Sequence, residues 1–520
     1  NISENAVTNN RVGIGGGGVY VKDSSSIIIL HNDIMDNFAF RYGGGIGCRG
    51  TQGNPDVSIN NNSIYTNKTQ WFGGGICICG LNDDVDALRA AGPLGGWRGS
   101  RVGIPCIVKK NEIQFNEVLF EDIEPRGGGV YNGAFRSSLS LVENSIQNNT
   151  TYGDGAGVSI LNMARVVAEN NNIYFNGSED GDDGGGINQW TFSSGIWRNN
   201  RIIGNQSGNN GGGMHITTRS NVTSEGNLFQ LNTTKGNERG GGGLYIRNSS
   251  FTSNGNNIFT QNTSNKHGGG IYIHSQYTQL FAASDSRISL TNGDKIEFNS
   301  ATKHGGGLFC QGSTYFQTFV KIEQIVCDSN SANSTVAGIK TSGAYFEYTG
   351  DLLYVQYSRF TGHNGAGITF EDYNDINPSV VRNNVFESNF AGIVSKKAWN
   401  SVRNNTFTGN RGYHLFIEDL SSAFKTRIIS NNFVWGQQTI SAIRVSGSLD
   451  HKSLLIHRNN FVGHNIDRNS YAIFISEKIS KFIDAENNWW NSPNGPHDPS
   501  PPGTDGDYNA NPSGDRVWDY

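Results

Sequence analysis

The stretch NNIFTQNTSNKHGGGIYI, from Asn256 to Ile273, contains the pattern that decides the fold. It has an Asn-rich start, a short apolar run, several polar residues, three glycines and a second apolar run. The same order returns in NNSIYTNKTQWFGGGICI from Asn61 and in NNIYFNGSEDGDDGGGINQ from Asn171. The apolar residue after the glycines recurs about every 30 residues, a period typical of solenoid proteins. We therefore expect a chain built from stacked repeats.

Apolar and polar residues alternate within each unit, which indicates short β-strands. Glycine suits the turns because it adopts positive φ angles freely. A unit of this length holds three short strands, each pairing with its copy one coil away at about 4.8 Å. The sequence therefore predicts an all-β parallel β-helix, or β-solenoid, of roughly 15 coils with three short strands per coil. Asparagines at one turn are expected to form a side-chain ladder through Asn144, Asn172, Asn200, Asn227 and Asn257.

The repeat resembles that of right-handed parallel β-helix proteins, the superfamily of pectate lyases, polygalacturonases and many prokaryotic surface proteins. Its GGG-I units are similar to the repeats of chlamydial polymorphic outer-membrane proteins. The segment ENNWWNSPNGPHDPS, from Glu486, resembles the closing coil of prokaryotic extracellular β-helix proteins. The resemblance implies a right-handed solenoid of the prokaryotic extracellular type. It does not fix the function, because the fold is shared by enzymes and structural proteins.

We expect a single β-helix domain over residues 1–492. The segment at about 80–105 interrupts the repeat and is interpreted as an insertion, and longer turns are expected at about 275–292 and 313–326. Residues 493–520 are rich in Pro, Gly and Asp and are expected to form an irregular C-terminal cap or the start of a linker. The chain begins in the middle of a repeat, so we interpret it as a trimmed piece of a longer protein.

The composition favours an exported protein. The net charge of −5 argues against nucleic acid as a partner, because no basic surplus is available to neutralise phosphates. No apolar run is long enough to predict a membrane span. Asn-x-Ser/Thr sequons fit an extracellular or cell-surface location with attached glycans. They include Asn67, Asn176, Asn205, Asn221, Asn232, Asn262 and Asn333.

The six cysteines also fit an exported chain with a few disulfides. Cys79 and Cys106 flank the insertion, so a disulfide between them is expected to close it. Cys48 and Cys310 fall at inward positions and are expected to be free core residues.

Equivalent residues of successive coils form rows along a solenoid, and one such row precedes the glycines. Asp154 and the pair Asp182-Asp183 come from neighbouring coils, so their carboxylates are expected about 5–10 Å apart, as in a glycoside hydrolase. One acid would protonate the leaving oxygen, and the other would activate water or attack the sugar. Crowding raises the pKa of one carboxyl, as such an acid requires. The alternative is that these aspartates are ordinary polar turn residues.

A second row follows the glycines and points outward. His215, Tyr245 and Arg247 lie in it where no turn requires them, so they join the aspartates as catalytic candidates. Aromatic rings stack on sugar faces, and charged groups bind hydroxyls. The expected substrate-binding residues are therefore Trp190, Asn188, Arg239, Tyr272, His267, His274, His304, Arg126 and Tyr131. For His267 and His304, duplication of the repeat is the simpler explanation.

The leading hypothesis is a glycoside hydrolase that acts on a polysaccharide or a cell-envelope glycan. A lyase is a rival, in which Arg247 or Lys266 neutralises a uronate carboxyl while Tyr245 or His215 moves the proton. The Gly181–Asp183 element is similar to the G-D-D element of polygalacturonases, but their other motifs are absent, which leaves pectin unsupported as the substrate. A glycosylated structural surface, sheath or adhesin repeat and a pure carbohydrate-binding module are further alternatives.

No cofactor is predicted with certainty and no metal-ligand set is recognised, although the acidic cluster is an alternative site for Ca²⁺. An uncapped first coil would expose strand edges and favour stacking of copies, so a homo-oligomer is a further expectation.

Overall fold

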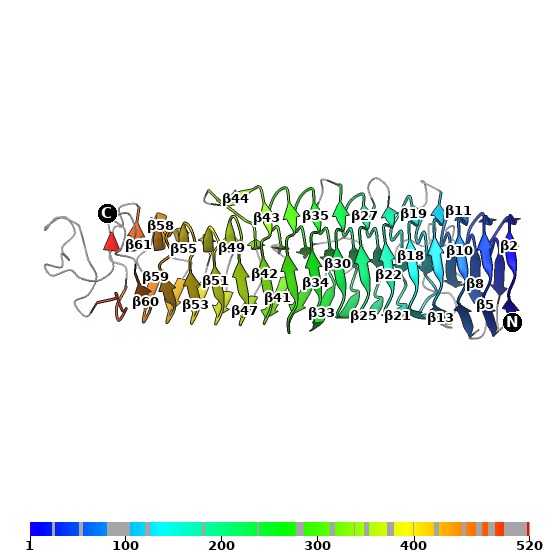
Figure 1. Cartoon of the computed structure of the whole chain (residues 1–520), viewed down its shortest axis with the longest axis horizontal. Coiled ribbons are helices and arrows are strands. Elements are labelled where there is room, and N and C mark those ends of the chain that lie inside the picture. Colours follow the sequence, from blue (N-terminus) through cyan, green and yellow to red (C-terminus); the bar gives the residue numbers. More distant parts are fainter. Residues whose placement is uncertain are drawn as a thin grey trace. The chain divides into compact units, whose positions relative to one another are not determined.

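The computed structural model describes most of the chain (Figure 1). Residues outside the description are 23–25, 51–55, 81–103, 120–124, 179–181, 237–238, 277–284, 313–317, 337, 348–352, 372–378, 399, 421–425, 450–453, 464–470, 477–483, 493–516 and 519–520. The chain forms two compact units. Unit 1 contains Asn1–Lys266, Gly270–Tyr272 and Tyr277–Ser286, and unit 2 contains His267–Gly269, Ile273–Gln276 and Arg287–Tyr520.

Unit 1 is a stack of short parallel strands in four sheets, here called sheets A to D. Sheet A contains β1 (Ile2–Ser3), β5 (Ile27–Leu30), β9 (Val57–Asn60), β13 (Pro105–Lys109), β17 (Ser138–Val142), β21 (Arg165–Glu169), β25 (Ser194–Arg198), β29 (Asn221–Glu225) and β33 (Ser250–Gly255). Sheet B contains β2 (Ala6–Thr8), β6 (Asp33–Met35), β10 (Ser63–Tyr65), β14 (Glu112–Gln114), β18 (Ser145–Gln147), β22 (Asn172–Tyr174), β26 (Arg201–Ile203), β30 (Leu228–Gln230) and β34 (Ile258–Thr260).

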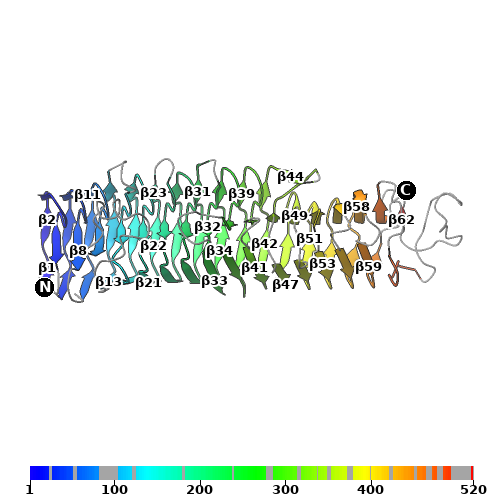
Figure 2. The ribbon, with the colours of Figure 1, turned by 180° about the vertical axis from the view of Figure 1, so that it is seen from behind.

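Sheet C is made of two-residue strands: β3 (Arg11–Val12), β7 (Phe38–Ala39), β11 (Lys68–Thr69), β15 (Glu117–Val118), β19 (Thr150–Thr151), β23 (Gly177–Ser178), β27 (Gln206–Ser207), β31 (Thr233–Thr234) and β35 (Thr263–Ser264). Sheet D follows the glycines and contains β4 (Val19–Lys22), β8 (Ile46–Gly50), β12 (Ile76–Gly80), β16 (Val130–Asn132), β20 (Val158–Ile160), β24 (Ile187–Gln189), β28 (Met214–Thr217), β32 (Leu244–Arg247) and β36 (Ile271–His274). The successive strands of one turn, such as β21, β22 and β23, belong to different sheets (Figure 2).

Unit 2 repeats this plan with the same four kinds of strand. Its sheet A strands are β37 (Ser286–Leu290), β41 (Thr318–Glu323), β47 (Leu353–Gln356), β50 (Ser379–Arg382), β53 (Asn400–Arg403), β56 (Thr426–Ile429) and β59 (Leu454–His457). Its sheet B strands are β38 (Lys295–Glu297), β42 (Val326–Asp328), β48 (Arg359–Thr361), β51 (Val385–Glu387), β54 (Thr406–Thr408), β57 (Asn432–Val434) and β60 (Asn460–Val462).

Sheet C of unit 2 has β39 (Ser300–Ala301) and β43 (Ser331–Ala332), and an antiparallel pair, β44 (Thr335–Val336) and β45 (Ile339–Lys340), follows. Sheet D has β40 (Leu308–Gln311), β46 (Ala344–Glu347), β49 (Ala366–Glu371), β52 (Ala391–Lys396), β55 (Tyr413–Leu420), β58 (Ser441–Leu449), β61 (Tyr471–Ile475) and β62 (Val517–Trp518).

The predicted all-β parallel β-helix is confirmed, and no helix occurs among the described residues. Sheets A and B each contain 16 strands over the two units, close to the roughly 15 coils expected. Three strands per turn occur in unit 2, for example β50 to β52, whereas the turns of unit 1 add the two-residue strand of sheet C. The domain boundaries stay predictions. Most of the insertion at 80–105, parts of the turns at 275–292 and 313–326, and most of residues 493–520 lie outside the described residues.

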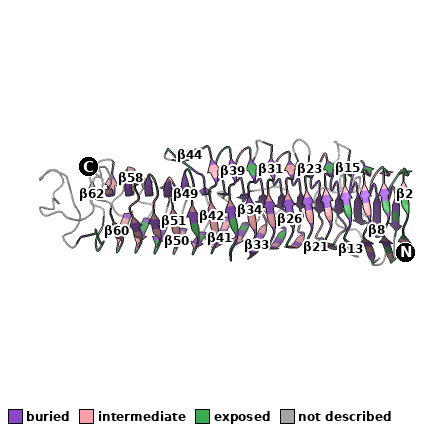
Figure 3. Ribbon diagram, viewed as in Figure 1, coloured by how far each residue is buried: buried purple, intermediate pink, exposed green. Residues whose placement is uncertain are grey.

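Alternation of burial places the core inside each turn (Figure 3). In β21, for example, Val166 and Ala168 are buried and Arg165 and Val167 are exposed. Equivalent inward rings stack on one another, as Phe229 does on Phe259 with centroids 4.6 Å apart. Removing such rows of apolar side chains from water is the main source of stability in a fold of this kind.

Two asparagine ladders, rather than one, hold the corners of the turns. The first runs through Asn144, Asn171, Asn200, Asn227 and Asn257, so the prediction of Asn172 was wrong by one residue. Asn172 lies on β22 and only half-buried, where its side chain accepts from Tyr174. The second ladder, which the sequence reading missed, runs through Asn149, Asn176, Asn205, Asn232 and Asn262.

The second ladder also corrects the glycosylation sites. Asn67, Asn176, Asn205, Asn232 and Asn262 are completely buried, so no glycan can be attached to these side chains in the folded chain. Asn221 and Asn333 are exposed and keep their sequons accessible. The number of sequons is therefore weak evidence for a glycoprotein. A ladder asparagine that is followed two residues later by serine or threonine gives the same Asn-x-Ser/Thr triplet.

The cysteines pair differently from the expectation. The disulfide joins Cys77 to Cys79, so the predicted bridge from Cys79 to Cys106 is wrong. Cys77 and Cys79 are two residues apart on β12 and therefore share one face of the strand. Cys106 is a free buried thiol, and Cys48 and Cys310 are free and buried as expected.

The glycine triplet is required where one turn approaches the next. A Cβ atom on Gly185 would lie 2.2 Å from the carbonyl oxygen of Gln206, a backbone atom of the following turn. We expect Gly185→Ala to destabilise unit 1 by about 3 kcal/mol, the upper range for an overpacked site. Gly177→Ala is the matched control, since its Cβ would meet nothing within 4 Å. Equal denaturation midpoints for the two variants would contradict this account of the triplet.

Candidate functional site

Asp154 and Asp183 lie in neighbouring turns of unit 1, each just before a glycine. The backbone N–H of Asp183 donates to Oδ1 of Asp154 at 3.0 Å, and Gly155 donates to the carbonyl of Asp183 at 3.0 Å. These bonds fix the two aspartates one rung apart. Parallel strands are spaced by about 4.8 Å, so the two carboxyl groups are held close together.

One oxygen of each carboxylate belongs to a third ladder. Oδ1 of Asp183 accepts from the backbone N–H of Asn210 at 3.0 Å and from its Nδ2 at 2.9 Å. Oδ1 of Asn210 in turn accepts from Gly240 N at 3.0 Å. Asn210 shows that an amide performs this structural task without a charge. The ladder therefore does not explain why the two preceding rungs carry carboxylates.

The second oxygen of each carboxylate faces other side chains. Oδ2 of Asp154 lies 3.5 Å from Nε of Arg126 and 3.4 Å from Nδ2 of Asn188. Oδ2 of Asp183 lies 3.5 Å from Nε2 of His215, whose Nδ1 lies 3.0 Å from Oδ1 of Asn188. Because an amide oxygen only accepts, His215 donates through Nδ1 and its Nε2 carries the lone pair that faces Asp183.

The carboxylates are accessible although their neighbours are enclosed. The Asp154 and Asp183 side chains are 21% and 18% exposed, whereas the His215 side chain is 3% exposed. The Arg126 guanidinium lies 4.0 Å from the ring centroid of the half-buried Trp190, whose Nε1 donates to Thr218 at 2.5 Å. The two carboxylates are thus bordered on one side by the Arg126 cation and the aromatic ring of Trp190.

Burial shifts the pKa values of the two aspartates and of His215 in opposite directions. It raises the pKa of Asp183 to about 6, against the opposing effects of Arg247, Asn210 and Arg239. Burial also raises the pKa of Asp154, while Arg126 opposes the rise. Burial, followed by the charge of Arg247, lowers the pKa of His215 to about 3. Near pH 5, Asp183 is therefore largely protonated and His215 is neutral.

The raised pKa of Asp183 predicts that the stability of the folded chain depends on pH. A carboxyl whose folded pKa lies above its unfolded value of 3.8 stabilises the fold below that value, and the contribution is lost as the pH rises through about 6. Asp183→Asn keeps the ladder and removes the ionisation, so its stability relative to wild type should rise by about 2 kcal/mol between pH 4 and pH 8. Denaturant unfolding of both proteins across this range measures the difference, and a constant difference would contradict the assigned pKa.

Several predicted sugar-stacking residues are too buried for that role. Tyr131, Tyr245 and Tyr272 are 3%, 0% and 1% exposed, so the expectation of an open aromatic row is wrong for them. Tyr131 stacks on Phe72 with centroids 4.6 Å apart, and Tyr245 lies between His215 and Tyr272. The outward positions of sheet D are covered because the residues before the glycines pack beside them.

The remaining candidates are divided between the cluster and other places. Arg239 donates to the Tyr245 hydroxyl at 3.2 Å and Arg247 to Thr217 at 3.1 Å, both at the edge of the cluster in unit 1. Asp182 is half-buried, and its backbone carbonyl accepts from Asn209 at 2.9 Å.

The three remaining histidines belong to unit 2. His267 and His304 stack at 5.5 Å, and they continue into the rings of Phe309 and Tyr345. His274 is half-buried at the end of β36, where Ile273 and His274 belong to unit 2. Within unit 2, these contacts make the first two histidines members of an aromatic stack.

Two contributors to the cluster were not among the predicted site residues. Asn210 supplies two hydrogen bonds to Asp183, and Thr218 accepts from Trp190. Asn210 occupies the same place before the glycines one turn after Asp183, so the register of the repeat contained the signal. Thr218 had no such signal, because its role depends on the rotamer of Trp190.

The fold defines the class of protein: stacked parallel strands form a β-solenoid, which is consistent with the parallel β-helix superfamily. A family model described as "Periplasmic copper-binding protein (NosD)" matches residues 311–494, so this part of unit 2 is similar to that family. No curated protein and no solved structure matches the chain. Among the described residues, no helix is long and apolar enough to cross a membrane.

Proposed function

We propose that the protein is an exported polysaccharide-active β-helix enzyme, a glycoside hydrolase whose acids are Asp154 and Asp183. The observation that carries the proposal is that Oδ2 of each carboxylate lies outside the ladder, in which the amide of Asn210 performs the same structural task without a charge. An exported location agrees with the similarity of residues 311–494 to a periplasmic family.

The two acids would have different roles. Asp183, with a pKa of about 6, is protonated in mildly acidic solution and would donate its proton to the leaving glycosidic oxygen. Asp154, in ion-pair contact with Arg126, would attack the anomeric carbon as a carboxylate. A rung spacing of about 4.8 Å is near the ~5–5.5 Å typical of retaining enzymes. Water would then release the sugar and return its proton to Asp183.

The lyase alternative has less support from the same residues. A lyase needs a base to remove a carbon-bound proton. The pKa of His215 is lowered to about 3, chiefly by burial, which makes it a weak base, and the hydroxyl of the buried Tyr245 already accepts from Arg239. A structural β-solenoid remains the second candidate, since the third ladder is a structural device whatever else the aspartates do.

Neither copper nor calcium is part of the proposal. Among the described residues, no group of three or more His, Cys, Asp and Glu side chains could hold a metal ion. In the segment similar to the copper-binding family, the Nδ1 atom of His363 accepts from Asn330 and the Nε2 atom of His414 lies 3.0 Å from the Val434 carbonyl. These residues do not fit a copper site.

Cleavage in ¹⁸O-labelled water tests the proposed reaction. A hydrolase places one solvent oxygen on the new reducing end, so the product mass should rise by the mass difference of one labelled oxygen. A lyase would give an unlabelled product with the absorbance of an unsaturated uronate, and that outcome would overturn the hydrolase proposal. Arg247→Ala would then test whether Arg247 neutralises the uronate in a lyase reaction.

A further inference from the structure

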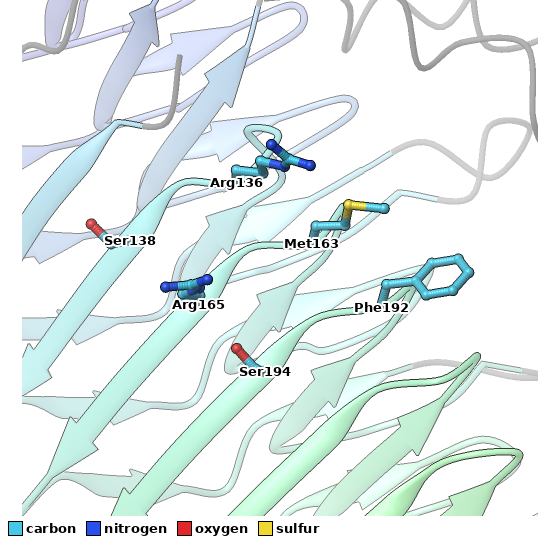
Figure 4. Close-up of a pocket in the computed structure, with 6 residues that line it drawn as sticks. All are labelled: Arg136, Ser138, Met163, Arg165, Phe192 and Ser194. Carbon is cyan, nitrogen blue, oxygen red and sulfur yellow. The ribbon is translucent and has the colours of Figure 1, made fainter. Parts of the chain in front are cut away.

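A pocket of about 740 Å³ lies beside the corner that joins sheet D to sheet A in unit 1 (Figure 4). It is lined by Arg136, Ser138, Met163, Arg165, Phe192 and Ser194. None of these residues belongs to the carboxylate cluster. The pocket combines two cations, two hydroxyls and an aromatic ring.

The floor of the pocket is fixed by strand register. Ser138 on β17 pairs with Arg165 on β21, which pairs with Ser194 on β25, so the guanidinium has a hydroxyl on either side. Figure 4 shows the Arg165 side chain between the two serines. Parallel strands keep such neighbours about 4.8 Å apart, a spacing that allows one small anionic group to contact all three.

The rim of the pocket comes from three successive corners. Arg136, Met163 and Phe192 occupy equivalent places, each with a positive φ near 60°. Hydrogen bonds from Met163 N to the Thr191 carbonyl and from Phe192 N to the Thr218 carbonyl hold these corners in register. Phe192 and Met163 thus provide an apolar wall beside the charged floor.

The two arginines have no opposing charge among the described residues. Arg136 and Arg165 are exposed and form no ion pair within that part of the chain. Isolated exposed arginines are ordinary solvated groups, so their charge alone would mean little. The hollow, the flanking hydroxyls and the aromatic wall are what distinguish this place, because an anionic sugar needs a cation, hydroxyl partners and a surface for its apolar face.

The pocket and the carboxylates belong to the same three turns. Strands β16, β20 and β24 begin just after Arg126, Asp154 and Asp183 and lead toward Arg136, Met163 and Phe192. Trp190, which packs on Arg126, lies two residues before Phe192. A sugar chain that crosses the turns at the carboxylates can therefore reach the pocket with another of its residues.

We propose that this pocket binds the anionic group, carboxylate or sulfate, of an acidic sugar residue. The proposal rests on the proposed function and deepens it, because it makes the substrate an acidic polysaccharide. Arg165 and Arg136 hold the anionic group, Ser138 and Ser194 donate to its oxygens, and Phe192 contacts the sugar ring.

Calorimetric titration tests the pocket separately from catalysis. Asp183→Asn protein would be titrated with a uronic-acid oligosaccharide, a sulfated oligosaccharide and a neutral oligosaccharide of equal length. The same titrations would follow with Arg136→Gln and Arg165→Gln added. The control carries Arg11→Gln and Arg201→Gln, two exposed arginines of unit 1 outside the pocket.

We expect one or both acidic oligosaccharides to bind, the pocket variant to bind roughly 10–100-fold more weakly, and the control to bind as the parent does. Preference for the uronate or the sulfate identifies the anionic group. Equal binding of the neutral sugar, no binding of either acid, or equal affinity of pocket and control variants would overturn the proposal. Binding that depends on the arginines, with no cleavage by wild type, would instead refute only the hydrolase.

Discussion

Asn205→Ala is expected to destabilise unit 1 by about 3–5 kcal/mol, because a buried polar side chain that links three turns would be lost. Oδ1 of Asn205 accepts from the backbone N and Nδ2 of Asn176, each at 3.0 Å. Its Nδ2 donates to the Ile173 carbonyl at 2.9 Å and to Asn232 at 3.1 Å. The change leaves each of these partners short of one hydrogen bond inside the solenoid. Denaturant unfolding followed by circular dichroism measures the loss.

Asn221→Ala is the matched control, since Asn221 is exposed on β29 and belongs to neither asparagine ladder. We expect its effect to stay within about 0.5 kcal/mol of zero. Similar losses for the two variants would mean that the ladder contributes no more than a surface asparagine. The same experiment bears on glycosylation, because an asparagine that the fold requires to be buried is unavailable as a glycan acceptor.

Asp183→Asn is expected to lower the turnover number by about 10²–10⁴-fold without loss of stability at pH 7. The new amide keeps the acceptor for Asn210, and its Nδ2 faces the lone pair of His215 Nε2 at the place of the carboxylate oxygen. The variant lacks the proton that the leaving group needs. Turnover of a cleaved polysaccharide and thermal unfolding of the same samples measure the two effects.

Asp182→Asn is the control for that experiment, because Asp182 is the adjacent half-buried aspartate and is not a rung of the ladder through Asp154, Asp183 and Asn210. We expect its turnover to stay within about twofold of wild type. Equal losses at Asp182 and Asp183 would contradict the separate role of Asp183. A stability loss confined to Asp183→Asn would show that the carboxylate itself is needed by the ladder.

The fold was predictable because the repeat specifies each turn locally. The glycine triplet, the alternating apolar residues and the asparagines recur in register, and each predicts the same stacked strands. The misassignment of Asn172 for Asn171 shows the limit of this reading. The sequence alone does not distinguish two adjacent asparagines. Only the inward direction of its side chain distinguishes the ladder residue Asn171 from the half-buried Asn172.

The site was partly predictable for the same reason. Asp154 and Asp183 occupy equivalent places in successive turns, so the repeat alone brings them together. The burial of Tyr245 and Tyr272 was not predictable, since alternation tells which residues point outward but not what packs over them. The Cys77–Cys79 disulfide was missed because the predicted pairing relied on the insertion between Cys79 and Cys106. The position of Cys77 and Cys79 on one face of the same strand was not considered.

The most direct test of the central claim is reducing-end release from a panel of acidic and neutral polysaccharides at pH 5, with wild type beside Asp183→Asn. The account predicts that wild type releases reducing ends from at least one acidic polysaccharide without the unsaturated-uronate absorbance, and that the variant, folded equally well, does not. Equal release by the two proteins, or none by either from any polysaccharide, would contradict the claim that Asp154 and Asp183 form a catalytic pair.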